Sequence, residues 1–314
     1  MSDIVDINTP WRPLALARCA SYVELTKPGI AGLVLVATGL SFALGLTETA
    51  GLQGPTALLN SLIPAFHTLF GTALVAGAAN ALNQLLEVRF DRQMIRTQDR
   101  PLPSARLTER EVLTFSAVAT LLGIAWLLVF VNGLCAALVA TSWAVYVFAY
   151  TPLKRITSMS VFVGATPGAL PPLIGWAGAT GHLSREAWML FAVMFFWQLP
   201  HFASIAWLYR EDYARAGYPV LPTIDRSGLR TSLHVVTHSV GLLFASLLPA
   251  LYGQTGVIYA AGAMVLGLAF LGCGVHFVVR QEHGRARLLL LSSLVYLPSL
   301  LMIMVVDRIV EMVR

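Results

Sequence analysis

Three oxygen-bearing side chains stand at the end of a long apolar run, and arginines follow them at once. Asn83, Glu87 and Asp91 are four residues apart, so an α-helix would place them within an arc of roughly 80° on one face. Arg96 and Arg100 come next in the chain. Because carboxylates suit a divalent cation and guanidinium groups suit phosphate oxygens, this segment predicts a site for a magnesium-bridged diphosphate.

A simpler interpretation of this cluster is a set of ion pairs where a helix leaves the membrane. Asn80 and Asn83 count against that interpretation, because they lie inside the apolar run and an unpaired amide is costly there. Arg96, Thr97 and Arg100 also place two guanidinium groups and a hydroxyl within one short segment. We therefore favour the functional interpretation.

A second cluster lies between residues 197 and 213. If one helix continued throughout, His201 and Asp212 would share a face but would be roughly 16 Å apart along the axis. One metal ion could not bind both, so Asp212 is expected at the diphosphate and His201 deeper, near an apolar substrate. A structural hydrogen-bonding role is the alternative for His201. The other candidate substrate-binding residues of this cluster are Trp197, Gln198, Tyr209 and Glu211.

A third cluster contains Tyr150, Lys154 and Arg155. The two basic residues either bind diphosphate oxygens or mark the cytoplasmic edge of the membrane. The glycine- and proline-rich segment 164–176 predicts either a kinked helix or a wall where helices part to admit a bulky flat ligand. The remaining histidines show no ligand spacing beyond one pair four residues apart, and we interpret all six as structural: His67, His182, His234, His238, His276 and His283.

The composition requires that membrane helices position these clusters. Of 314 residues, 57% are hydrophobic and 12% are charged, about half the charged fraction of a soluble domain. Nine apolar runs approach the roughly 20 residues that cross a bilayer. We therefore predict an all-α, polytopic membrane bundle that forms a single domain over residues 1–314. The predicted spans are 28–46, 62–86, 112–131, 133–150, 159–179, 186–204, 232–252, 256–279 and 287–306.

The distribution of basic residues predicts the orientation of this bundle. Most of the 21 Lys and Arg residues fall before the first span or in the loops after even-numbered spans. By the positive-inside rule, the amino-terminal segment 1–27 and these loops are cytoplasmic, and the carboxyl terminus is outside. The first residues resemble neither a transit peptide nor a cleavable signal, which favours a bacterial plasma membrane. The net charge of +5 thus reflects topology and gives no reason to expect a nucleic acid partner.

The segment from Asn83 to Arg100 resembles the first diphosphate motif of the UbiA superfamily of intramembrane prenyltransferases. The resemblance covers most of the chain, from Glu24 to the last span. The segments around Lys154 and from Trp197 to His201 are similar to the branch of the superfamily that farnesylates haem B.

Two features depart from the wider superfamily. Glu87 stands where many members have Asp, and the sixth span offers His201, Glu211 and Asp212 in place of a fuller Asp-rich repeat. These departures argue against an enzyme that prenylates quinone precursors. They also leave open which residue of the second cluster touches a metal ion.

The resemblance implies transfer of a farnesyl group from farnesyl diphosphate to the 2-vinyl group of haem B, with addition of water, giving haem O. It implies that His201 orients the haem or acts as a base on the incoming water. A haem A synthase or a terminal oxidase assembly is the implied class of protein partner. The implied Mg²⁺ ligands are Asn83, Glu87, Asp91 and Asp212. The implied diphosphate ligands are Arg96, Arg100, Lys154 and Arg155.

Three other functions are compatible with parts of the sequence. A prenyltransferase with an aromatic, quinone or chlorin acceptor would share the diphosphate site. A transporter or channel would place charges near the bilayer midplane, in two matching halves with broken helices, whereas the clusters here lie toward one side. A haem-binding assembly factor without catalysis would leave the arginine-flanked carboxylates without a role.

Overall fold

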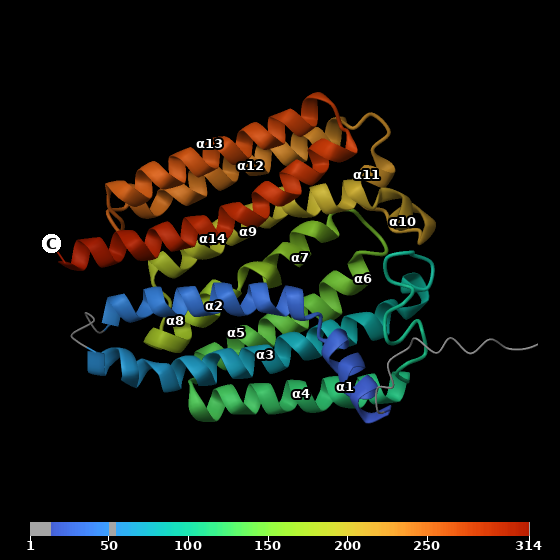
Figure 1. Cartoon of the computed structure of the whole chain (residues 1–314), viewed down its shortest axis with the longest axis horizontal. Coiled ribbons are helices and arrows are strands. Elements are labelled where there is room, and N and C mark those ends of the chain that lie inside the picture. The colour runs from blue at the N-terminus through green and yellow to red at the C-terminus, as the bar shows by residue number, and fades with distance from the viewer. Residues whose placement is uncertain (1–13, 50–54, 314) are drawn as a thin grey trace, which may run out of the picture.

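The protein is described by a computed structural model over residues 14–49 and 55–313. Throughout these two ranges the regular structure is helical, which confirms the predicted all-α class. The long helices run side by side along one direction (Figure 1). They are α2 (Pro28–Thr49), α3 (Pro55–Asp91), α4 (Glu109–Phe130), α9 (Arg185–Leu208), α12 (Leu229–Leu251), α13 (Val257–Val279) and α14 (His283–Val313).

A further crossing is built from three consecutive helical pieces. Helix α5 (Gly133–Ala144) passes through a wider π-helical turn (Val145–Tyr150) into α6 (Thr151–Leu153). With this composite segment, the described residues contain eight helical segments long and apolar enough to cross a membrane. Lys154 directly follows α6, at the end of this composite crossing.

The fifth predicted span, 159–179, is a broken helix instead of a continuous one. It consists of α7 (Ser160–Ala169) and α8 (Pro171–Thr180), separated at Leu170. Pro171 and Pro172 cause the break, because proline lacks an N–H group and its ring clashes with the preceding turn. The nine predicted crossings therefore correspond to eight long segments and one interrupted pair.

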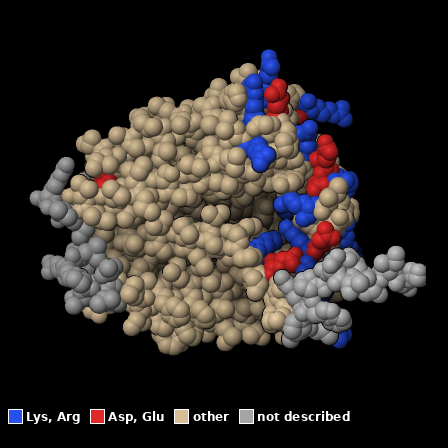
Figure 2. Space-filling view, in the orientation of Figure 1, with Lys and Arg blue, Asp and Glu red and all other residues tan. Residues whose placement is uncertain are grey.

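Short helices gather at one end of the bundle. They are α1 (Leu14–Leu25), α10 (Arg210–Arg215) and α11 (Leu221–Ile224), together with the loop from 92 to 108. Most Lys and Arg side chains visible in Figure 2 lie at this same end, with several Asp and Glu side chains among them. Helix α14 finishes at the opposite end (Figure 1). The predicted one-sided distribution of basic residues is thus present in the fold.

Glycines let several of these helices approach closely. A Cβ atom on Gly175 of α8 would collide with the carbonyl oxygen of Thr38 in α2, and one on Gly123 of α4 would lie 2.9 Å from the carbonyl oxygen of Gly71 in α3. Gly164 is likewise covered by the Tyr150 ring. The glycine-rich segment therefore serves close packing, which favours the kinked-helix interpretation over a wall whose helices part.

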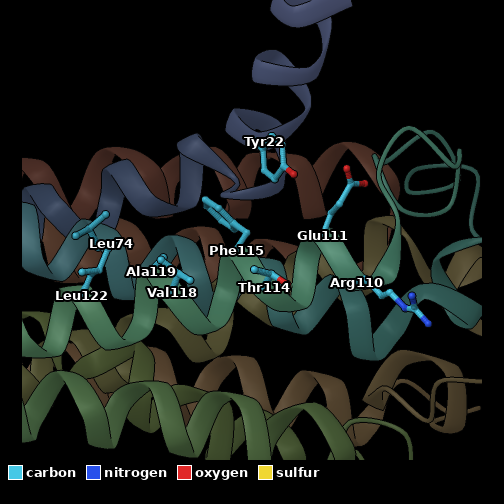
Figure 3. A pocket seen from close by; sticks show the side chains of 9 residues that line it. All are labelled: Tyr22, Leu74, Arg110, Glu111, Thr114, Phe115, Val118, Ala119 and Leu122. Carbon is cyan, nitrogen blue, oxygen red and sulfur yellow. The ribbon is translucent and has the colours of Figure 1, made fainter.

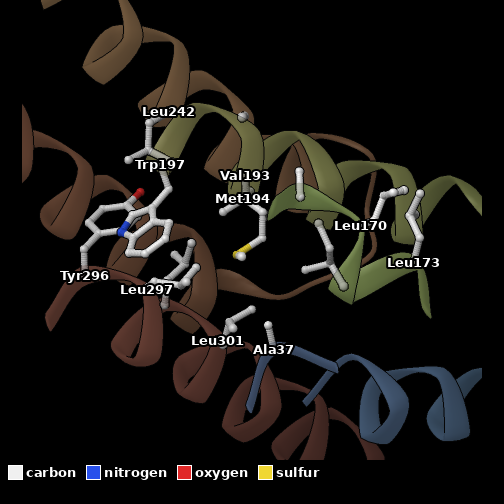
Figure 4. Close-up of a cluster of buried hydrophobic side chains, with 14 of the residues drawn as sticks. Ala37, Leu170, Leu173, Val193, Met194, Trp197, Leu242, Tyr296, Leu297 and Leu301 are labelled. Carbon is white, nitrogen blue, oxygen red and sulfur yellow. The ribbon is translucent and has the colours of Figure 1, made fainter. Parts of the chain in front are cut away.

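The main hydrophobic core fixes α9 against α12 and α14 (Figure 4). Trp197 and Tyr296 are its largest members shown there, and both satisfy their polar atoms. The indole Nε1 of Trp197 donates to the Ser293 carbonyl oxygen at 2.8 Å, and the Tyr296 hydroxyl lies 2.7 Å from Ser246 Oγ. Such pairing lets large aromatic groups be buried without leaving a polar atom unsatisfied.

An open groove of about 680 Å³ lies where α1 crosses α3 and α4 (Figure 3). Its walls include Tyr22, Leu74 and Phe115, and its polar end carries Arg110 and Glu111. The groove contains none of the predicted site residues. The predicted site residues lie instead on α3 and the loop after it, and on or beside α6, α9 and α10.

Candidate active site

The predicted carboxylate face is present on the last turns of α3. Asn83, Glu87 and Asp91 are only 2%, 2% and 0% exposed. The side-chain Oδ1 atom of Asn83 accepts a hydrogen bond of 2.9 Å from Lys27 Nζ, and its Nδ2 atom donates to Thr151 Oγ1 at 3.2 Å. Asn83 therefore connects the hinge between α1 and α2 with the start of α6.

Glu87 is paired with Lys154. The Lys154 Nζ atom lies 3.2 Å from Glu87 Oε1, and it also lies 4.6 Å from the ring centroid of Tyr218 and 5.8 Å from that of Tyr213. Burial opposes the charged form of Lys154, but Glu87 together with Tyr150, Tyr213 and Tyr218 outweighs it and holds the pKa of this ammonium group well above its usual range. Lys154 is thus a fixed cation surrounded by a carboxylate and two aromatic faces.

Asp91 is paired with Arg100. Both carboxylate oxygens accept from Arg100 Nη1, at 3.0 and 2.9 Å. Thr97 Oγ1 donates to the Asp91 carbonyl oxygen at 2.9 Å. The loop after α3 therefore folds back over the helix end, which brings the predicted arginine to the Asp91 carboxylate and the Thr97 hydroxyl to the Asp91 backbone.

The second acidic helix end meets the first. The backbone N–H of Arg96 donates to Asp212 Oδ2 at 3.3 Å, and its guanidinium group lies 4.8 Å from the ring centroid of Tyr209. Asp212 also pairs with Arg215. Asp212 is therefore connected to the end of α3 through the loop that follows Asp91.

The assumption of one helix from His201 to Asp212 is wrong. Helix α9 ends at Leu208, and Tyr209 has φ −110° and ψ 23° before α10 begins. Arg96, in the loop from 92 to 108, contacts Tyr209 and Asp212. These contacts outweigh the helical tendency of the sequence around Tyr209. The turn leaves Asp212 buried, while the adjacent predicted residue Glu211 is exposed.

His201 lies deep in the bundle, as predicted, but it faces α14. Its Nδ1 atom is 2.7 Å from Ser293 Oγ, and the Trp197 ring stacks on it at 5.0 Å with an interplanar angle of 19°. Its exposed fraction is 9%. Trp197 and Ser293 together hold the imidazole ring at a fixed orientation.

Three other predicted residues make mainly structural contacts. The Asn80 amide donates to the Thr26 carbonyl oxygen at 2.9 Å, and the Gln198 amide donates to that of Ala165 at 2.8 Å. Arg155 binds a carbonyl oxygen on α3 and covers the Phe90 ring at 4.8 Å. In the described ranges, Arg155 forms no ion pair with the carboxylates of the cluster.

A groove of about 430 Å³ leads away from the charged cluster between α7, α9 and α12. Tyr150, Lys154 and Tyr213 line the end nearest the cluster. Phe162, Phe202 and further apolar side chains form most of the remaining wall. An apolar substrate can therefore lie in this groove with one end against the charged groups.

The donor atoms at this end of the bundle fit a hard divalent cation. Glu87, Asp91 and Asp212 offer carboxylate oxygens, but no three His, Cys, Asp or Glu side chains in the described part of the chain gather closely enough to hold an ion alone. Mg²⁺ commonly takes one or two carboxylates and completes its shell with water and substrate phosphate oxygens. This arrangement fits that mode and does not fit a closed protein cage.

Sequence reasoning missed two polar groups at the site. Burial and the Arg100 guanidinium group lower the pKa of Lys27 to about 7, and its only sequence signal is its place one residue before the first span. The Tyr218 hydroxyl is buried and has no hydrogen-bond partner among the described residues. An unpartnered donor beside Lys154 is suited to a phosphate oxygen.

The fold and the site together define an intramembrane prenyltransferase. The UbiA prenyltransferase family matches residues 49–295 of the sequence, so the chain belongs to this family. A protein named protoheme IX farnesyltransferase from Solibacter usitatus is 45% identical over 288 residues, covering 91% of this chain and 98% of that protein. One of the same name from Koribacter versatilis is 38% identical over 315 residues, covering 98% and 99%.

Solved structures agree with the fold. A digeranylgeranylglyceryl phosphate synthase has a TM-score of 0.73 at 17% identity, covering 93% of this chain and 99% of that chain. A UbiA homologue from Archaeoglobus fulgidus, bound to GPP and Mg²⁺, has a TM-score of 0.61 at 13% identity and covers 90% and 99%. At these identities the likeness establishes the architecture of the bundle.

Proposed function

We propose that this protein transfers the farnesyl group of farnesyl diphosphate to the 2-vinyl group of haem B, with addition of water, and releases haem O and diphosphate. The observation that carries the proposal is the 45% identity to a protein named protoheme IX farnesyltransferase, over nearly the full length of both chains. The cluster of paired cations and carboxylates supports the same reaction, since it offers partners for both diphosphate and metal.

The diphosphate would bind at the meeting point of α3 and α10. In the proposed complex, phosphate oxygens accept hydrogen bonds from the guanidinium groups of Arg96 and Arg100 and from the Lys154 ammonium group. Asp91 and Glu87, the present partners of Arg100 and Lys154, then become available to Mg²⁺. The proposed ligands of the ion are Asn83, Glu87, Asp91 and Asp212. Bound Mg²⁺ would supply charge neutralisation for the departing diphosphate.

Departure of diphosphate leaves an allylic cation, which the vinyl group of haem B attacks to form the new carbon–carbon bond. Water adds to the resulting cation and gives the hydroxyethylfarnesyl side chain. Water that arrives before that bond forms would produce farnesol, so the site must exclude it at first. The burial of Asn83, Glu87 and Asp91 supports this requirement.

His201 is proposed to act on the acceptor side of the reaction. Its fixed ring and deep position suit either orientation of the haem or removal of a proton from the adding water. In both roles the Nε2 atom would contact the substrate or the water, because Nδ1 already lies at hydrogen-bond distance from Ser293.

The proposed location is a bacterial plasma membrane, with the charged end in the cytoplasm and the carboxyl terminus outside. The gathering of basic side chains at one end supports that orientation (Figure 2). Haem O would then pass to a haem A synthase or to a terminal oxidase assembly, which are the proposed protein partners.

The direct test supplies purified protein with haem B, farnesyl diphosphate and Mg²⁺ and analyses the products by mass spectrometry. Haem O should form with the wild type and should be lost with Asp91→Ala. Asp99→Ala, which removes an exposed carboxylate from the loop that follows Asp91, is the matched control and should keep activity. Recovery of unchanged haem alongside a prenylated hydroxybenzoate or quinol precursor would overturn the proposal in favour of another acceptor.

A further inference from the structure

The groove between α7, α9 and α12 has chemistry that the diphosphate site does not use. Its walls are mostly apolar, and Phe202 and Leu233 on its lining are 37% and 66% exposed on the bundle surface. Its volume of about 430 Å³ is within the range of small-molecule sites, roughly 300–1,000 Å³. A flat apolar ligand could therefore enter it sideways from the bilayer.

Two cationic side chains line this groove. Lys154 belongs to the diphosphate cluster, whereas Arg230 belongs to the first turn of α12. Arg230 is exposed and forms no ion pair with any described carboxylate. A guanidinium group free to form a bidentate contact is a suitable partner for the carboxylate of an otherwise apolar ligand.

The third feature is a histidine whose free nitrogen can be assigned. His238 lines the groove, and its Nδ1 atom lies 2.6 Å from the carbonyl oxygen of His234. Because a carbonyl oxygen only accepts, Nδ1 must carry the proton and Nε2 must hold the lone pair. That tautomer, fixed by a backbone carbonyl, is the form in which histidine ligates a metal.

The surroundings of His238 suit a planar ring. The Phe162 ring lies 5.4 Å from it and the His234 ring 4.2 Å from it, so three rings meet at this part of the wall. Arg230 lies eight residues earlier, or about 12 Å along the helix axis. A ligand that fills the space between them needs a metal at its centre, an apolar ring and a carboxylate at its edge.

We propose that haem B, the acceptor in the proposed function on which this inference rests, binds in this groove with its iron on His238 Nε2 and a propionate on Arg230. The reacting 2-vinyl group and one propionate lie on neighbouring pyrrole rings. Both can therefore face the charged end, where Lys154 and Tyr213 adjoin the diphosphate cluster.

This placement separates the two substrates. Figure 2 shows the surface hollowed beside the basic side chains, over the gap between α2 and α14 in Figure 1. The farnesyl chain takes that side and the haem takes the α7–α9–α12 side. His201, which does not line the groove, is then left to act on the adding water.

The first test measures haem binding without turnover. Purified protein is titrated with haem B in the absence of farnesyl diphosphate, and the Soret band and resonance Raman spectrum report the iron ligand. His238→Gln should remove the histidine-ligated signature and raise the Kd by about tenfold or more. His276→Gln, at an exposed position on α13, is the control and should leave both measurements unchanged.

The second test concerns the propionate. The wild type should bind haem B more tightly than its dimethyl ester, whose propionates carry no charge. Arg230→Gln should bind the two compounds equally, whereas Arg226→Gln, an exposed arginine in the preceding loop, should discriminate as the wild type does. An Arg230→Gln protein that still prefers the free acid would overturn the assignment.

The outcomes distinguish the two proposals. If the wild-type protein binds no haem B and prenylates another acceptor, the proposed function itself is overturned. If the wild type forms haem O but the His238→Gln variant keeps the histidine-ligated spectrum, only the assignment of haem B to this groove is overturned. A rise in KM for farnesyl diphosphate in His238→Gln, with haem binding unchanged, would also overturn it, because the groove would then hold the prenyl chain.

Discussion

Lys154 Nζ lies 3.2 Å from Glu87 Oε1, and this ion pair joins the end of the fourth crossing to the last turns of α3. The Lys154 side chain is 15% exposed and that of Glu87 is 3% exposed, so both charges are largely removed from water. Each partner is proposed to serve the reaction, one toward phosphate and one toward Mg²⁺. The pair therefore holds the site together before substrate arrives.

Replacing Lys154 with Gln should lower both stability and activity. It leaves the Glu87 carboxylate buried without its cation, which costs about 3 kcal/mol, and it removes one donor to the leaving group, which typically costs ~100-fold in kcat. Thermal unfolding in detergent and steady-state assays measure the two effects. Lys154→Arg keeps the charge and should retain most of the stability.

A double variant separates the structural effect from the catalytic one. Lys154→Gln with Glu87→Gln removes both charges, so the unfolding temperature should recover toward the wild-type value while haem O formation stays low. Recovery of turnover together with stability would show that the pair serves only the fold.

Removal of divalent metal should stop the transfer. Excess chelator should abolish haem O formation and added Mg²⁺ should restore it, whereas Ca²⁺ should restore it poorly because it prefers more ligands at longer distances. Asp91→Asn should raise the Mg²⁺ concentration for half-maximal activity by about tenfold. The Soret spectrum of bound haem B serves as the control and should not respond to the chelator. Undiminished turnover in chelator would contradict the proposed metal role.

The part of the site that could be predicted from sequence is the part set by helix geometry. A spacing of four residues alone places Asn83, Glu87 and Asp91 on one face. The contact between Lys27 and Asn83 spans 56 positions, and it depends on how α1 turns into α2, which no local pattern encodes. Tyr218 reaches Lys154 for a similar reason, through the loop between α10 and α11.

The helices themselves were predictable because apolar run length decides whether a segment can cross a bilayer. The break at Leu170 follows from the two prolines after it, which the sequence displays. The break at Tyr209 has no such signal, since Arg210 and Glu211 are good helix formers. Contacts with the Arg96 loop, made only in the folded bundle, determine the turn there.

The close approach of α2 and α8 should make Gly175 intolerant of any side chain. Gly175→Ala places a methyl group against the Thr38 carbonyl oxygen, and relief of this overlap should cost about 1–3 kcal/mol. Gly272→Ala in α13, where a Cβ has nothing within 4 Å, is the matched control and should be neutral or slightly stabilising. Equal unfolding temperatures for the two variants would contradict the tight packing.

The Asp225 carboxylate should make part of the stability depend on pH. Burial opposes its ionised form, but several hydrogen bonds together outweigh burial. Thr231 donates from N and Oγ1 at 2.8 and 3.0 Å, and Ser227 Oγ donates at 3.0 Å. The pKa of Asp225 is consequently held below its usual value. These bonds anchor the start of α12, which carries Arg230 and His238.

Because the folded pKa of Asp225 lies below the unfolded value of about 3.9, its contribution is fully present above that pH and is lost as the pH falls through the folded pKa. Asp225→Asn should therefore unfold at a lower temperature than the wild type near neutral pH, and the gap should close as the solution is acidified below about pH 4. Asp99→Asn, in an exposed loop position, should show no such gap. Paired unfolding curves in detergent across this range measure it, and a gap that stays constant with pH would mean that ionisation of Asp225 does not stabilise the start of α12.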